Sequence, residues 1–140
     1  SVSYPVVITK ASDTSITQAS DLKGKSSANS SGSNWGAIAQ KYGATVNPVS
    51  QFMDAVAAVK AGRVDLTVND QLAALDYFNT THDTKVKIAL KLTGDKVSQG
   101  IAFRKGSGLL PAVNQAIAEL RQDGTLALIG QKYFGEDVSK

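Results

Sequence analysis

The 140-residue sequence contains no cysteine and a single histidine. Without cysteine the chain has neither a disulfide framework nor a thiolate metal site, so its fold must depend on packing. No apolar run approaches the roughly 20 residues that a membrane-spanning helix requires. Basic residues exceed acidic ones by only 15 to 12 and lie scattered, which argues against the clustered basic face of a nucleic-acid-binding protein.

The remaining composition, 42% hydrophobic and 19% charged, is typical of a globular protein. A chain of 140 residues is long enough to bury the core of one domain and too short for two complete ones. It starts at Ser1 with no methionine and no charged-then-apolar leader. We therefore expect a processed form or a segment excised from a longer polypeptide.

Strands and helices are predicted to alternate through most of the chain. Each of three short strands, at residues 26–29, 44–49 and 62–70, is followed by a segment with apolar residues at helical spacing. Three strand–helix units with short links predict right-handed crossovers and an α/β fold, with a mostly parallel sheet flanked by helices. Further strands are predicted at residues 4–10, 85–90 and 99–105.

Two helices are predicted after the last strand, and the first has an apolar stripe formed by Leu110, Val113, Ile117 and Leu120. Burying one such side chain contributes roughly 1.5–3 kcal/mol, so the stripe is expected to face inward. The helices of the three strand–helix units are expected to cover the sheet already. We therefore expect the stripe to require a second surface.

A carboxylate stands at the end of the third predicted strand. In GRVDLTVND, residues 62–70, Asp70 comes where an apolar strand gives way to a helix. The carboxyl ends of parallel strands form the ligand crevice of an open α/β sheet, so Asp70 is a candidate ligand-binding residue. The alternative is that Asp70 caps the following helix through its side-chain oxygen, and the two roles are compatible.

Four blocks of the sequence occur in the order typical of one protein family. They are DLKGK at 21–25, SNWG at 33–36, AGRVDLTVND at 61–70, and a block from AFRKG to QKYFG at 102–135. With these blocks the chain resembles the extracytoplasmic solute-binding proteins of ABC importers, and most closely their polar amino-acid family. The resemblance covers nearly the whole chain. It implies two α/β lobes that close on a ligand, like a Venus flytrap, about two hinge strands.

The resemblance also implies a division of this chain into parts. Residues 1–10 and 99–105 would be the two hinge strands, residues 11–98 the second ligand-binding lobe of the type II periplasmic-binding-protein fold, and residues 106–140 the C-terminal helices of lobe one. The first part of lobe one has no counterpart, so we expect a fragment of a receptor. An uncovered apolar stripe would then favour self-association, and ligand binding would be weak.

In this family an amino-acid ligand is held by its two opposite charges, each of which must be paired when it leaves water. Asp70 aligns with the carboxylate that receives the α-ammonium. The residues Ser31, Gly32 and Ser33 align with a small-residue turn at a helix N-terminus, where N–H groups and a hydroxyl would receive the ligand carboxylate. For Ser33 the alternative is an ordinary helix cap. The family's arginine that clamps the same carboxylate comes from lobe one and has no counterpart here.

The block from Asn29 to Gly36 looks most like the cystine-binding branch of the family, a resemblance that depends on Asn34 and Trp35. Asn34 is therefore included among the ligand-binding candidates. Trp35 is either a ligand contact or the first core residue of its helix, and the helical spacing favours the core.

The resemblance implies capture of an amino acid, cystine or another polar one, for delivery to an ABC transporter permease. The location would be extracytoplasmic, either the periplasm or a lipid anchor at the outer surface. One alternative is the ligand-sensing domain of a signalling receptor. An enzyme is less favoured because no nucleophile elbow, phosphate loop or metal cluster is visible, and His82 lies in a polar turn where we expect it to be solvated. No catalytic residue, cofactor, metal or nucleic acid is expected.

Overall fold

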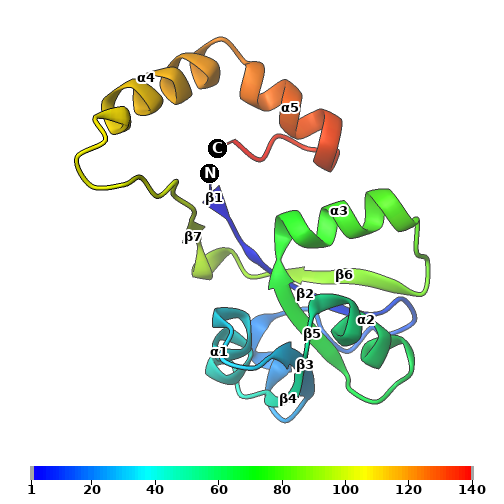
Figure 1. Cartoon of the computed structure of the whole chain (residues 1–140). Coiled ribbons are helices and arrows are strands. Elements are labelled where there is room, and N and C mark those ends of the chain that lie inside the picture. Colours follow the sequence, from blue (N-terminus) through cyan, green and yellow to red (C-terminus); the bar gives the residue numbers. More distant parts are fainter. Residues whose placement is uncertain (1, 140) are drawn as a thin grey trace.

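The computed structural model of the protein describes residues 2–139. Residue 1, the first of the predicted hinge strand at 1–10, and residue 140, the last of the predicted C-terminal segment, lie outside the described residues. The main sheet has five strands in the spatial order β4-β3-β5-β2-β6 (Figure 1). Their bounds are β2 (Pro5–Lys10), β3 (Ser26–Ser30), β4 (Thr45–Val49), β5 (Leu66–Asp70) and β6 (Val86–Lys91).

The sheet is mixed. β3 pairs in parallel with β4 and β5, whereas β2 pairs antiparallel with β5 and β6. Four of these strands therefore point the same way and β2 points the opposite way. The predicted α/β fold with a mostly parallel sheet flanked by helices is confirmed. β2 fits in the interior of the sheet because it is apolar on both faces: Val6, Val7 and Ile8 are each no more than 1% exposed.

Helices cover both faces of the sheet. α1 (Asn34–Lys41) packs on one face, and α2 (Phe52–Lys60) and α3 (Gln71–Thr81) pack on the other. The residues of β2 alternate between the two cores, as strand geometry requires: Val7 joins the α1 side and Ile8 joins the α2 side. Two short 3-10 turns complete this part, η1 (Ala19–Leu22) and η2 (Thr93–Asp95).

A second, two-stranded antiparallel ribbon consists of β1 (Val2–Ser3) and β7 (Val97–Ser98). It lies between the main sheet and the C-terminal helices (Figure 1). The predicted strand at residues 99–105 is wrong, because residues 99–104 have no regular structure and Ile101 is 64% exposed. An alternating segment forms a strand only beside a partner that satisfies its backbone groups, and the pairing of β7 with β1 ends at Ser98.

The C-terminal helices α4 (Leu109–Gln122) and α5 (Thr125–Phe134) lie away from the sheet (Figure 1). α5 packs on α3, where the Asn79 side-chain amide donates to the Tyr133 carbonyl at 3.1 Å. The α4 stripe does not face the sheet. Leu110 is 53% and Leu120 is 37% exposed, because α4 packs against α5, so the stripe is uncovered, as expected for a chain that lacks the first part of lobe one. Within residues 2–139, no helix combines the length and apolar character needed to cross a membrane.

Candidate functional site

The candidate site lies at the edge of the sheet where β3 and β5 end. These adjacent parallel strands pair with Ser27 opposite Leu66, so their carboxyl ends reach the same edge. Asn29, which is 3% exposed, joins them near that end by donating from its side-chain amide to the Val68 carbonyl at 2.7 Å. The turn after β3 and the carboxylate at the end of β5 are therefore neighbours on adjacent strands.

The turn after β3 leads directly into α1. Gly32 has φ +70°, a left-handed conformation that favours glycine, and the Ser33 N–H donates to the Ser30 carbonyl at 3.1 Å. The Ser33 hydroxyl accepts from the Gly36 N–H at 3.1 Å, so its predicted capping role is confirmed. A side chain on Gly36 would lie 3.4 Å from both Asn29 and Ser33, so a glycine there allows the helix to approach the strand closely.

The turn opens on a surface hollow of about 340 Å³. Ser31, Gly32 and Ser33 line it together with Val46 and Pro48 from β4. Asn34 does not line this hollow. It lines a different hollow, together with Lys41. Three of the four ligand-binding candidates in this part of the chain thus line one hollow, and Asn34, the next residue, lines another.

Asp70 is 7% exposed and has hydrogen-bond donors on both carboxylate oxygens. Its Oδ1 accepts from the Leu72 N–H at 2.7 Å, so the predicted helix cap is confirmed, and from the Ser3 hydroxyl at 2.7 Å. Its Oδ2 accepts from the Gln99 side-chain amide at 3.1 Å. Sequence reasoning missed Ser3 and Gln99, because no periodicity or motif relates positions 67 and 29 residues from Asp70.

Trp35 and His82, considered from the sequence, and Gln71, at the start of α3, are located as follows. Trp35 is partly buried and packs against the core cluster on the α1 side, as its helical spacing indicated. His82 is exposed, as expected, and ends α3 with φ +51°. Gln71 is buried, and its side-chain amide donates to the Glu136 carboxylate, which links the N-terminus of α3 to the segment after α5.

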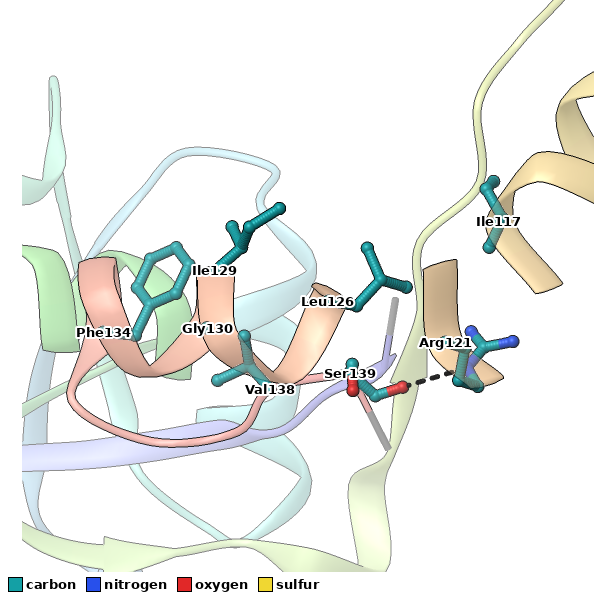
Figure 2. Close-up of a pocket in the computed structure, with 8 residues that line it drawn as sticks. All are labelled: Ile117, Arg121, Leu126, Ile129, Gly130, Phe134, Val138 and Ser139. Carbon is teal, nitrogen blue, oxygen red and sulfur yellow. Dashed lines mark hydrogen bonds between the residues drawn. The ribbon is translucent and has the colours of Figure 1, made fainter. Parts of the chain in front are cut away.

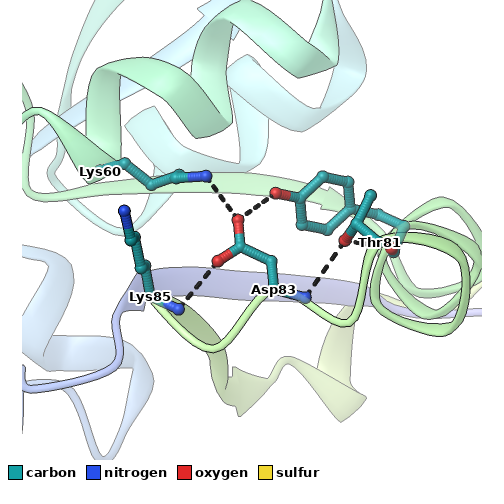
Figure 3. Close-up of polar contacts among 5 residues, drawn as sticks. Lys60, Thr81, Asp83 and Lys85 are labelled. Carbon is teal, nitrogen blue, oxygen red and sulfur yellow. Dashed lines mark hydrogen bonds and ion pairs between the residues drawn. The ribbon is translucent and has the colours of Figure 1, made fainter.

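A polar network lies at the opposite end of α3 from Asp70 (Figure 3). The Asp83 carboxylate accepts from Lys60 Nζ at 2.6 Å and from the Tyr77 hydroxyl at 2.5 Å on one oxygen, and from the Lys85 N–H at 2.8 Å on the other. These contacts, with Lys60 first, lower the pKa of Asp83 from 3.8 to about 2. Burial and the bond to Asp83 raise the pKa of Tyr77. The network ties α2, α3 and the start of β6 together.

An apolar hollow of about 220 Å³ lies between α4 and α5 (Figure 2). Ile117, Leu126, Ile129 and Phe134 contribute to its wall, and Arg121 closes one side by donating to the Ser139 carbonyl at 3.4 Å. An apolar wall does not match the two charges of an amino acid, whereas the β3–β5 edge offers groups of both polarities. Among residues 2–139, no three His, Asp or Glu side chains are grouped closely enough to hold a metal ion.

Comparisons with known proteins agree on one family. A sequence profile of the bacterial extracellular solute-binding proteins, family 3, matches residues 31–136. The L-cystine-binding protein TcyA of Bacillus subtilis is 45% identical over 139 residues, which are 99% of this chain and 52% of that protein. A probable amino-acid ABC transporter-binding protein of Haemophilus influenzae is 42% identical over 136 residues, which are 96% of this chain and 52% of that protein.

The solved structures include a similar receptor. The L-cystine solute receptor of Neisseria gonorrhoeae, in its unliganded open conformation, matches with a TM-score of 0.80 and 34% identity. The match covers 100% of this chain and 60% of the receptor chain. The chain spans about half the length of the curated relatives it matches.

Proposed function

Because this chain belongs to the bacterial extracellular solute-binding proteins of family 3, we propose that it binds an amino acid at the edge where β3 and β5 end. The observation that carries the proposal is the arrangement of opposite polarities on two adjacent strands. β5 ends in the Asp70 carboxylate, and β3 ends in a turn whose hydroxyls and N–H groups begin α1. An amino acid carries the matching pair of charges on a single carbon.

The assignment of the two charges follows from the chemistry of each strand end. The α-ammonium would donate to Asp70, in hydrogen bonds that are strengthened by charge on both sides. The α-carboxylate would lie at the turn of Ser31, Gly32 and Ser33, where the N-terminal end of α1 favours an anion. Asn34 would contribute from the first residue of α1, beside the turn rather than within its hollow.

Cystine is the ligand that the comparisons favour, since the names of the B. subtilis and N. gonorrhoeae relatives state cystine binding. The H. influenzae relative, named as a probable ABC transporter-binding protein, supports delivery of the ligand to an ABC permease. The family is extracellular, and within that location we propose the periplasm or a lipid anchor at the outer surface.

The proposed function assigns roles to the remaining segments. The five-stranded sheet and its helices would be the second lobe, so residues 5–10, expected to belong to the first hinge strand, would be part of this lobe as β2. The ribbon of β1 and β7 would be part of the hinge, and α4 and α5 would pack on the other lobe. Segments that complete the other lobe would lie outside these 140 residues. An open α4 face supports the expected self-association of the chain on its own.

An amide NMR titration tests the binding site directly. The ¹⁵N-labelled chain is titrated with L-cystine to its solubility limit and, separately, with L-glutamine, L-arginine and L-glutamate to millimolar concentrations. Resonances of the 31–34 turn and of the residues around Asp70 should shift together for the preferred ligand. A folded spectrum that none of these amino acids alters would refute the site.

Asp70→Asn is the matched variant for this titration. Asparagine is as good a helix cap as aspartate, so the fold should persist while the charge that meets the ammonium is lost. In the complete receptor we expect affinity to fall by more than 2 kcal/mol, about 30-fold, because the buried ammonium would lack its counter-charge, and in the 140-residue chain the ligand-dependent shifts should disappear. Asp76→Asn, on the exposed side of α3, is the control and should bind like the wild type.

A further inference from the structure

The carboxylate of the proposed site accepts hydrogen bonds from β1 and from the residue that directly follows β7. Ser3, which is 1% exposed and belongs to β1, donates to Asp70 Oδ1. Gln99, which directly follows β7, donates to Oδ2. The ribbon and the site are thus joined through the two oxygens of one side chain.

The two oxygens of Asp70 differ in the number and length of the hydrogen bonds that they accept. Oδ1 receives two bonds of 2.7 Å, one from the backbone of Leu72 and one from the buried Ser3 hydroxyl, and these use both of its lone pairs. Oδ2 receives the longer bond of 3.1 Å from Gln99, an exposed residue in a segment without regular structure. Oδ2 is therefore the oxygen on which a donor is more easily replaced.

An amide and an ammonium are unequal competitors for that oxygen. The Gln99 amide is a neutral donor, whereas the α-ammonium of an amino acid forms a charge-assisted hydrogen bond roughly twice as strong. With Oδ1 occupied, an ammonium that binds Asp70 must engage Oδ2, where the Gln99 amide already lies.

We infer that Gln99 is a positioning residue whose side-chain amide occupies the ammonium position on Asp70 in the unliganded protein. Ligand binding displaces this amide from Oδ2. Gln99 directly follows Ser98, the last residue of β7, so the exchange takes place beside the end of the ribbon. This inference rests on the proposed function and adds that the incoming ammonium exchanges with a donor of the protein itself on one oxygen of Asp70.

The exchange also has a consequence for selectivity. A ligand without a charged donor gains too little on Oδ2 to replace the amide, so the site rejects analogues that keep the carboxylate and side chain but lack the ammonium. Removing the amide should relieve the competition. The Gln99→Ala variant should therefore bind free amino acids about fivefold more tightly, in line with a net hydrogen-bond contribution of about 1 kcal/mol.

The test is a comparison of free and N-acetylated amino acids by NMR on the 140-residue chain. In the wild type, the free amino acid that shifts the 31–34 turn should also shift the Gln99 side-chain NH₂ signals and the amides of Val97 and Ser98. Its N-acetyl derivative, which lacks the ammonium, should leave the Gln99 signals in place. Gln115→Ala, which removes an exposed glutamine of α4, is the control and should not change affinity.

The outcomes separate the exchange from the proposed function. Shifts at the turn and around Asp70 with unmoved Gln99 signals, or a Gln99→Ala variant whose affinity is unchanged or weaker, would overturn the exchange and leave amino-acid binding intact. A spectrum that responds to no amino acid would overturn amino-acid binding, and the exchange with it. Coupled shifts at the turn, Gln99 and β7, with tighter binding by Gln99→Ala, support both.

Discussion

Replacing Asp83 with alanine should destabilise the fold through the hydroxyl that the carboxylate leaves behind. Tyr77 is 7% exposed, and its hydroxyl donates to Asp83 at 2.5 Å. A buried polar group that loses its partner costs about 1–3 kcal/mol, and we expect a loss of about 2 kcal/mol in the free energy of unfolding. The Lys60–Asp83 ion pair adds little to this figure, because the Lys60 side chain is 35% exposed to solvent and such pairs are weak.

A double-mutant cycle isolates this mechanism. Tyr77→Phe removes the hydroxyl and should cost about 1 kcal/mol on its own, the usual net value of a hydrogen bond. In the Asp83→Ala background the same substitution should cost nothing or restore stability, because it removes an unpaired buried hydroxyl. Urea unfolding followed by circular dichroism measures all four variants. Equal costs of Tyr77→Phe in both backgrounds would refute the reasoning, and Asp76→Ala, an exposed aspartate of the same helix, is the control.

Three further predictions follow from the structure. The pKa of Asp83 is about 2 in the folded state and 3.8 ordinarily, so its ionised carboxylate stabilises the fold fully above about pH 5, and this contribution is lost as the pH falls toward 2. Urea unfolding at several pH values should therefore show a smaller loss of unfolding free energy at low pH for Asp83→Ala than for the wild type. Gly36→Val should weaken binding and stability by forcing α1 away from Asn29 and Ser33, as titration and unfolding would detect; unchanged behaviour would mean that the helix shifts without cost. Leu110→Lys, in the apolar stripe of α4 at a residue 53% exposed, should reduce self-association in light scattering, and a wild type that stays monomeric at high concentration would contradict it.

Local patterns predicted much of this protein because they act through neighbouring residues. The strand-to-helix junctions at Ser33 and Asp70 were recognisable as helix caps, and in the structure both side chains accept from N–H groups of the first helical turn. Helical spacing likewise indicated that Trp35 would pack in the core. A periodic pattern did not predict the structure where the segment also needs a partner. Residues 99–105 alternate without a neighbouring strand, and the apolar stripe on α4 has no sheet beneath it.

The sequence by itself therefore determined the α/β class, the order of its units and the two strand ends where polar groups collect. The tertiary structure alone decided which groups share those ends. Ser3 and Gln99 meet Asp70 because β2 enters the sheet beside β5 and because β1 and β7 pair into a ribbon at the same edge. Contacts between residues far apart in the chain depend on strand order and pairing, which no local spacing records. For this reason the predicted carboxylate was visible in the sequence and the donors that hold it were not.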